Sequence, residues 1–354
     1  SEENIMTTIN GKPKIIKEIN MALVRKNIIR NSPITKPELS KLLGLSLPTV
    51  NKCVDELLEK EIVKVFEGEV EVKGSGKKPI FYEINSDHVS YIAAYFKGTV
   101  LTVREYNLLG KVKNEKVKKL KEDSDEKILI SVLDKMIKES KNKENIEAIS
   151  IGIAGIMEEN GSINNVYTLK NFNGIFLKEV LEERYDIPII IENDANLVTF
   201  GLVDKIEFNT RDLVYIYLGT GIGTGTVING KLHKGKSNFS GEIGELPVST
   251  DKTLEDDYKE IIKRKDMEKF EKLIIFILMI NISILNPEII VLSSDILKIE
   301  KSLLKRIIKK ISERFGEENM PEIILDSNDI ENGMKGALKL ALQESDKDLK
   351  IIGK

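Results

Sequence analysis

The sequence predicts a small winged helix-turn-helix domain, mainly α-helical, followed by a larger α/β domain. Two short helical segments separated by Gly44, and then two strand-like segments flanking a loop at 74–79, predict the first domain. Apolar strand-like segments that alternate with helical segments after about residue 88 predict the second. The chain has 354 residues, 41% of them hydrophobic, which is enough for two or three packed domains.

Apolar spacing and capping residues indicate the first two helices. From Pro13, isoleucines and leucines recur at three- and four-residue steps until the Ser-Pro pair at 32–33 interrupts them. Thr35 is expected to cap a second helix, because Glu38 three residues later completes a capping box. Gly44 is expected to end that helix, since glycine readily adopts the left-handed backbone that follows a helix.

A third helix and a strand–loop–strand unit come next. Ser46 is expected to cap the helix, whose apolar residues at 50, 54, 57 and 58 fall on one face. Residues 63–66 and 80–84 predict two strands. The loop between them contains glycines and two lysines, as a DNA-contacting wing would.

The helices, the turn and the wing come in the order typical of a DNA-binding domain. The N-terminal part of the recognition helix enters the major groove, where Asn51 could bond an adenine edge in two places. The wing lysines could reach phosphates or a minor groove. The alternative is a three-helix subdomain that packs against another part of the protein. The candidate DNA-binding residues are Thr35, Ser46, Leu47, Thr49, Asn51, Lys52, Lys77 and Lys78.

The charge distribution supports the same N-terminal segment as the partner of a polyanion. The whole chain has a net charge of −3, which is not typical of a basic nucleic-acid binder. Residues 11–84 hold 14 Lys and Arg against 10 Asp and Glu, whereas residues 85–354 hold 40 against 45. The positive excess is small, and it supports DNA binding only together with the motif.

The second domain is predicted from apolar runs and turn signals. Asn229-Gly230 indicates a tight hairpin. The run 273–285 is too short and too polar for a membrane span and indicates a buried helix. The C-terminal part is expected to be mostly helical, with 289–292 as its one strand. The other expected strands are 91–96, 100–106, 146–153, 187–191 and 213–218, and the other expected helices include 127–138 and 175–185.

Five short blocks of the second domain resemble the ROK family, which groups repressors with sugar kinases. They are Glu-Asn-Asp-Ala-Asn at 192–196, the glycine-rich run 218–225, Asn-Gly-Lys-Leu at 229–232, Gly-Glu-Ile-Gly at 241–244 and the segment 286–292. Each block alone is weak, but they come in the family's order after a winged helix-turn-helix. The resemblance covers nearly the whole chain.

The resemblance implies a two-lobed, RNase H/actin-like ATPase fold, as in sugar kinases. The expected domains are a winged helix-turn-helix at 11–86, a first lobe at 87–197 with 332–350, and a second lobe at 198–331. A cleft between the two lobes would hold the ligand.

The resemblance also implies a sugar site. Carboxylates and amides suit it, because sugar hydroxyls need both hydrogen-bond donors and acceptors. Glu245 stands where the family has a histidine, which alters the rim of the site. The alternative for each residue is an ordinary loop polar group. The sugar-binding candidates are Asn171, Asn193, Asp194, Glu242, Glu245 and Glu255.

The nucleotide site that the family implies looks degraded. The family's kinases have an acidic residue and glycines in a first phosphate loop, where this chain has Tyr95 and Lys97. Ser293-Ser294 replace a glycine pair after a later strand. We therefore expect weak or no kinase activity, with Asp194 as the catalytic base only if some activity is retained. The vestigial second phosphate loop comprises Gly219, Thr220, Gly221 and Gly223.

No bound metal or cofactor is expected. The family's zinc site would need a histidine at Glu245 and a cysteine cluster in the cysteine-free segment 246–253. His88 and His233 are expected to be packing, surface or structural residues. ATP and magnesium are not expected as ligands either, because the same resemblance implies that the ATP contacts are degraded.

The chain is expected to be cytoplasmic, because its N-terminus has no signal-peptide pattern and no segment is predicted to cross a membrane. Its single cysteine, Cys53, cannot form an intrachain disulfide and fits a reducing compartment.

Three functional hypotheses follow. The first is a sugar-responsive repressor that binds a palindromic double-stranded operator as a homodimer or higher homo-oligomer. The second is a ROK sugar kinase, acting on a hexose or related sugar, with a fused DNA-binding domain. The third is a regulator whose cavity has degenerated and binds no sugar. The sequence favours the first, since the sugar residues are kept and the nucleotide residues are not.

Overall fold

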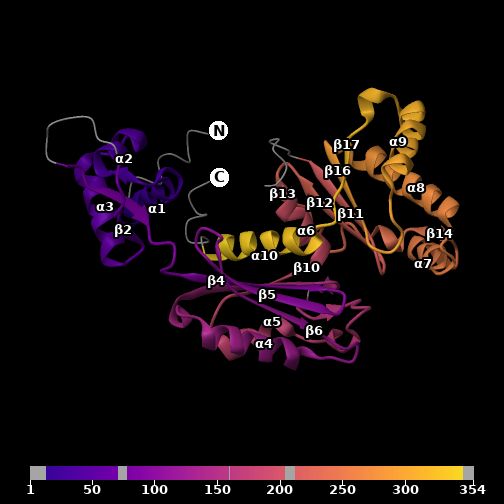
Figure 1. Ribbon diagram of the computed structural model, residues 1–354, viewed down its shortest axis with the longest axis horizontal. Coiled ribbons are helices and arrows are strands. Elements are labelled where there is room, and N and C mark those ends of the chain that lie inside the picture. Colours follow the sequence, from indigo (N-terminus) through magenta and orange to yellow (C-terminus); the bar gives the residue numbers. More distant parts are fainter. Residues whose placement is uncertain (1–12, 71–77, 159, 204–211, 346–354) are drawn as a thin grey trace. The chain divides into compact units, whose positions relative to one another are not determined.

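The computed structural model describes residues 13–70, 78–158, 160–203 and 212–345 (Figure 1). Those residues form two compact units. The first contains the described residues up to Ser90 together with Asn107–Lys111 and Ser345, and the second contains Tyr91–Tyr106 and Val112–Glu344. None of the described helices is long and apolar enough to cross a membrane.

The first unit is a winged helix-turn-helix. Its three strands form one antiparallel sheet in the order β1-β3-β2. Helices and strands share one core, in which Val24, Leu39, Val54 and Tyr82 are buried. Its elements are α1 (Pro13–Asn31), β1 (Ile34–Thr35), α2 (Lys36–Leu43), α3 (Leu47–Glu59), β2 (Val63–Val65) and β3 (Phe81–Ile84).

The predicted caps of this unit are confirmed. Thr35 and Glu38 form a reciprocal capping box at the start of α2, and Gly44 follows that helix with a φ of 64°. Ser46 accepts a hydrogen bond from the backbone N–H of Thr49 at the start of α3. Strand β1 was not predicted, because two residues are too few to produce an alternating pattern.

The first lobe of the second unit is a five-stranded sheet in the order β10-β7-β4-β5-β6. Helices α4 and α5 cover one face of this sheet (Figure 1), and their residues Leu133 and Leu181 are buried in the core of the lobe. Its strands are β4 (Ser90–Lys97), β5 (Val100–Asn107), β6 (Val112–Lys119), β7 (Ile146–Ile153) and β10 (Ile189–Asn193). Its other elements are α4 (Glu126–Glu139), η2 (Lys143–Asn145), β8 (Ile156–Met157), β9 (Ile163–Asn164), η3 (Lys170–Phe172) and α5 (Leu177–Tyr185).

The second lobe is another five-stranded sheet, in the order β13-β12-β11-β16-β17. Helices α7, α8 and α9 supply its core, with Tyr258, Ile274 and Ile307 fully buried. Its strands are β11 (Leu213–Leu218), β12 (Ile222–Ile228), β13 (Lys231–Leu232), β14 (Pro247–Ser249), β15 (Lys252–Thr253), β16 (Ile289–Ser294) and β17 (Glu322–Leu325). Its helices are η4 (Ile243–Glu245), α7 (Leu254–Arg264), α8 (Met267–Leu285), α9 (Lys301–Phe315) and η5 (Glu317–Asn319).

Two helices, α6 (Asp194–Leu202) and α10 (Asp329–Ser345), cross each other through glycines. A Cβ on Gly201 would lie 2.0 Å from the carbonyl oxygen of Asn332, and one on Gly336 would lie 2.0 Å from that of Leu197. Helix α6 contacts β10 of the first sheet and β11 and β12 of the second. The α6–α10 pair therefore packs backbone to backbone next to both sheets.

Several sequence predictions for this unit need correction. The C-terminal part contains β17 as well as β16; β17 has only four residues and gains its place from parallel pairing with β16. Strand β6 was missed because it is an edge strand whose mostly exposed Lys and Glu residues do not alternate with apolar ones. Helix α8 is buried on one side only, since Phe276 and Ile284 are 45% and 74% exposed.

The other predicted elements are found close to the expected positions, and the hairpin turn is confirmed. Asn229 and Gly230 both have positive φ, at 53° and 73°, as the tight turn between β12 and β13 requires. The predicted domain boundaries stay a prediction, and the one between residues 197 and 198 falls within helix α6.

Candidate functional site

Helix α3 has an exposed face at its N-terminal end. Val50, Val54 and Leu57 are buried in the core of the first unit, whereas Leu47 is 42% exposed and Lys52 is exposed. Asn51 is half-buried between these two faces. An apolar, an amide and a cationic side chain thus lie together on the part of the helix that would enter a DNA groove.

The structure supports the predicted capping role of Thr35 and not its predicted role as a DNA contact. It is 7% exposed, and its hydroxyl donates to the Glu38 carboxylate at 2.8 Å. Because its hydroxyl is buried and hydrogen-bonded to Glu38, Thr35 stabilises the start of α2 and is not available to contact DNA. Ser46 caps α3 by accepting from the backbone N–H of Thr49. The hydroxyls of the two residues are 2.8 Å apart, and Ser46 is exposed.

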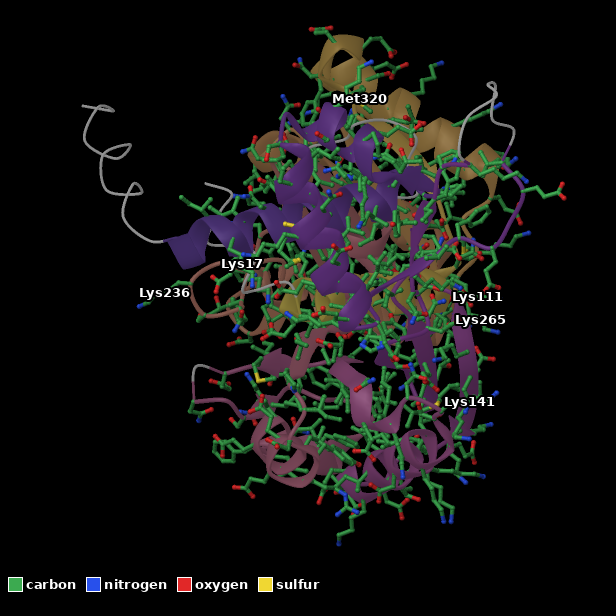
Figure 2. The ribbon with its side chains drawn as sticks, turned by 90° about the vertical axis from the view of Figure 1, so that its left-hand side faces the viewer. Lys17, Lys111, Lys141, Lys236, Lys265 and Met320 are labelled. Carbon is green, nitrogen blue, oxygen red and sulfur yellow. The ribbon has the colours of Figure 1, made fainter. Side chains whose placement is uncertain are left out.

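Several charged side chains of the first unit affect how this face would meet phosphates. Asp55 lies on the outer side of α3, and the Lys36 ammonium neutralises it at 2.5 Å. Lys78 is exposed just before β3, and Lys77 lies outside the described residues. On α1, Lys17 pairs with Glu56 of α3 at 2.6 Å and so is partly neutralised (Figure 2).

The second unit contains a cavity of about 480 Å³ lined by both lobes. It brings together residues that are more than 100 positions apart in the sequence, from β4 to the start of α10. The predicted residues that line it are Asn193, Asp194, Thr220, Gly221, Gly223, Glu242, Glu245 and Glu255.

Asn193 and Asp194 are placed by the start of α6. Asn193 caps the helix by accepting from the backbone N–H of Asn196 at 3.2 Å, and its amide donates to the carbonyl of Gly155 at 3.1 Å. The Asp194 carboxylate accepts from the N–H of Ala195 at 2.9 Å. Burial raises the pKa of Asp194 to about 6. The cap therefore fixes both side chains at the cavity wall.

Carboxylates dominate the polar lining of the cavity. Burial, followed by the charges of Asp194, Glu245 and Glu255, raises the pKa of Glu242 to about 7. A neutral molecule with several hydroxyl donors suits this lining, because carboxylates accept hydrogen bonds and repel anions.

Glu255 is already engaged with the glycine-rich turn. Its Oε2 accepts from the backbone N–H of Ile222 at 2.8 Å, and Lys259 lies 3.3 Å from its Oε1. A Cβ on Gly221 would lie 2.8 Å from this carboxylate, so the glycine is needed for the close approach. A phosphate at the Ile222 N–H would have to displace a carboxylate.

Two predicted residues lie away from the cavity. Asn171 does not line it; its amide donates to the carbonyl of Asp123 at 2.7 Å, and it stabilises a loop. Gly219 lies behind the wall, where its N–H donates to the Gly221 carbonyl and its carbonyl accepts from the Tyr258 hydroxyl. Sequence position alone could not show which way these loop residues face.

Lys97 lies within a network of acidic residues and hydroxyls. Its ammonium is 3.1 Å from Asp295 and 2.8 Å from Asp329. Asp329 also accepts from the hydroxyls of Tyr215 at 2.8 Å and Ser293 at 3.0 Å. Asp295 and Asp329 were not predicted, because each owes its role to a partner about 200 residues away.

Tyr167 is a further lining residue that the sequence did not indicate. It is 62% exposed, and the Lys259 ammonium lies 5.0 Å from the centre of its ring. Such an exposed aromatic ring could cover the apolar face of a sugar. A lone tyrosine in a loop carries no sequence signal for this position.

Comparisons with known proteins fit this architecture. A model of the ROK family matches residues 99–257, and a model of the winged helix-turn-helix DNA-binding domain matches residues 26–64. The chain belongs to the ROK family.

The chain is similar in sequence to repressors and in fold to a solved structure. The xylose repressor of Caldicellulosiruptor bescii is 30% identical over 68% of this chain and 61% of its own length. The xylose repressor of Bacillus subtilis is 30% identical over 66% of this chain and 61% of its own. A ROK family transcriptional regulator described as a homologue of Escherichia coli Mlc superposes on 96% of this chain with a TM-score of 0.70 at 16% identity. The chain thus spans about 61% of the length of the xylose repressors that it matches, and the structural likeness shows the fold alone.

The ROK nucleotide site does not fit a nucleotide here. Tyr95 is buried, and its ring fills the space next to Gly152 and Gly333. A phenol at this position does not supply the carboxylate that would help to hold a metal ion. Lys97 brings a positive charge that the two carboxylates already bind. Neither residue therefore supports the binding of ATP or magnesium.

The ROK zinc site does not fit zinc either. Glu245 is exposed and follows Gly244, and no thiolate lies in the segment 246–253. Within the part of the chain that the structure describes, no three His, Cys, Asp or Glu residues could hold a metal ion. His233 is exposed after β13, and His88 lies 3.8 Å from Glu61.

Proposed function

We propose that this ROK protein is a sugar-responsive, DNA-binding transcription regulator, most simply a repressor of carbohydrate-utilisation genes. One observation carries the proposal: the cavity keeps Asn193, Asp194 and Glu242 around a space for hydroxyl groups, while Lys97 and its two carboxylates occupy the nucleotide side. The relatives named xylose repressors support a pentose or similar aldose as the effector.

The effector would bind by hydrogen bonds from its hydroxyls to the carboxylates. Asn193 and Asp194 belong to the start of α6, whereas Glu242 and Glu255 come from the second lobe. A sugar that contacts both sets has different affinities for open and closed lobes, and it would shift the population between them. No ATP, magnesium or zinc is needed for this step.

DNA binding would use the outer face of α3 together with the wing. Leu47, Asn51 and Lys52 are the contacts best placed for bases and phosphates. A recognition helix of this kind reads one half-site, so a homodimer or higher homo-oligomer on a palindromic operator is the expected functional form. Such a regulator would act in the bacterial cytoplasm, where its DNA is.

The experiment is an operator selection with the full chain. A random pool of duplexes is enriched on the purified protein, and affinity for the selected sequence is measured by fluorescence anisotropy with and without a panel of aldoses. The triple variant Asn51→Ala/Lys77→Ala/Lys78→Ala should lose the operator, and Lys60→Ala, at the other end of α3, should keep it. Failure of the wild-type chain to enrich any sequence would sink the proposal.

A sugar kinase with a fused DNA-binding domain is the second candidate. Asp194 favours it, since a buried carboxylate with a pKa of about 6 could accept a hydroxyl proton. Sugar-dependent release of ADP from ATP in a coupled assay would establish this activity. We expect no turnover above background. A panel in which no sugar changes melting temperature or operator affinity would instead favour a degenerated cavity.

A further inference from the structure

The contacts of Lys97 join the two lobes directly. Lys97 ends β4 of the first sheet, and Asp295 directly follows β16 of the second. The ammonium–carboxylate distance between them is 3.1 Å. Asp329, the first residue of α10, lies 2.8 Å from the same ammonium and is almost fully buried. We call Lys97, Asp295 and Asp329 the clasp.

Hydroxyl groups hold both carboxylates of the clasp in position. Asp295 accepts from Tyr217 at 2.8 Å, and Asp329 accepts from Tyr215 at 2.8 Å and from Ser293 at 3.0 Å. All three donors belong to strands of the second sheet. The acceptors are therefore preorganised, and the ammonium pays little of the ordering cost that weakens most surface ion pairs.

A separate contact fixes α10 to the first lobe. Arg104 of β5 makes two hydrogen bonds to Glu331, at 2.9 and 2.6 Å. The first turn of α10 is thus tied to the first sheet through Glu331 and to the second through Asp329. Lys97 adds the link from β4 to Asp295, which closes the connection on the cavity side.

We infer that Lys97 is a tethered cation that substitutes for a bound nucleotide as the bridge between the lobes. It favours the lobe arrangement in which the sugar cavity is formed, and a bound sugar would shift the population further toward that arrangement. Both carboxylates are anchored to the second sheet, so removal of the ammonium breaks their link to β4 and leaves them partly buried without their cation. The lobes then separate on that side, and Asn193 and Asp194 move away from Glu242 and Glu255.

The test measures the distance between the lobes. Spin labels are attached at Lys141→Cys in the first lobe and Lys309→Cys in the second, in a full-length Cys53→Ala background. Both lysines are exposed, and Figure 2 marks Lys141 at the surface. With Lys97 present, the pulsed dipolar distance distribution should be narrow. With Lys97→Met it should broaden about twofold or more and move to longer distances, as expected for two exchanging arrangements.

The matched control is Lys116→Met, which removes a lysine that is 17% exposed, against 25% for Lys97, from its ion pair with Glu139 inside the first lobe. That variant should leave the distribution unchanged, and Lys97→Arg should restore it. If Lys97→Met does not fold, Lys97→Gln supplies the same comparison, because it also removes the cation. Equal distributions for the control and for Lys97→Met or Lys97→Gln would overturn the inference. Neither operator nor sugar enters the measurement, so its failure is distinct from failure of the proposed function.

Discussion

At the scale of single residues, the carboxylates of the cavity are notable for being protonated more easily than usual. Glu242 has a pKa of about 7 instead of 4.5, and Asp194 has one of about 6 instead of 3.8, in both cases mainly through burial. The folded chain therefore binds more protons than the unfolded chain between about pH 4 and pH 7. These two groups destabilise the fold most at high pH.

This predicts the pH dependence of stability in the absence of sugar. The melting temperature should rise as the pH falls from 8 to 6. Protonation of Glu242 removes a buried negative charge, and with it the desolvation cost of that charge and its repulsion by neighbouring carboxylates. Glu242→Gln should flatten the rise, and Glu313→Gln, an exposed site on α9, should not. The measurement is differential scanning calorimetry at several pH values. A wild-type curve without slope in this range would contradict the assignment.

Tyr167 is predicted to contribute to sugar affinity through its ring. Tyr167→Ala should weaken binding by about fivefold, corresponding to ~1 kcal/mol of lost aromatic contact. Tyr167→Phe should bind nearly as well as the wild type, since it keeps the ring and loses only the hydroxyl. Isothermal titration with the effector from the panel gives both constants. Equal losses in the two variants would instead point to a hydrogen bond from the hydroxyl.

Residue-scale prediction from the sequence succeeded for caps and failed for orientation. Thr35, Ser46 and Gly44 are capping residues because their local chemistry is complete within four positions. The same Thr35 was also a DNA candidate, and a buried hydroxyl cannot serve both roles. The orientation of Asn171 is set by its hydrogen bond to the carbonyl of Asp123, which is 48 residues away in sequence.

At the scale of elements, helices α6 and α10 cross at a close backbone-to-backbone contact. Gly201 and Gly336 leave no space for a methyl group next to the facing carbonyl oxygens. Gly336→Ala should therefore reduce the free energy of unfolding of the second unit by ~1–3 kcal/mol, the usual range for overpacking. Urea unfolding followed by far-UV circular dichroism measures it. Lys335→Ala, on the exposed side of the same helix, should change stability by less than ~0.5 kcal/mol.

Prediction from the sequence was most accurate for long elements with a clear apolar pattern and failed for short strands. Helices α3 and α4 and strands β7 and β11 have strong periodic or apolar patterns and were found close to the expected bounds. Strands β1 and β17 have two and four residues, and pairing partners far away in sequence define them. Such short strands have no local signal to detect.

At the scale of the whole molecule, the order of short motifs predicted the site better than any one motif did. The blocks around Asp194, Gly221 and Glu242 do converge on one cavity. The clasp could not be foreseen, since Lys97 meets its partners at separations of 198 and 232 residues. Lys97 was expected to be an obstacle to phosphate, and its carboxylate partners make it a structural link as well.

The division into two units predicts that operator binding and sugar binding can be lost independently. Asn51→Ala/Lys52→Ala should lose most operator affinity, with a shallower salt dependence from the missing lysine, yet its melting temperature should still rise with the effector sugar. Asp194→Asn should keep operator affinity but fail to respond to sugar, because its carboxylate acceptor is gone. Anisotropy titrations over several salt concentrations, together with thermal shifts, separate the two phenotypes. If Asp194→Asn lost the operator as well, the cavity would control DNA binding without sugar, and the effector-driven population shift would have to be abandoned.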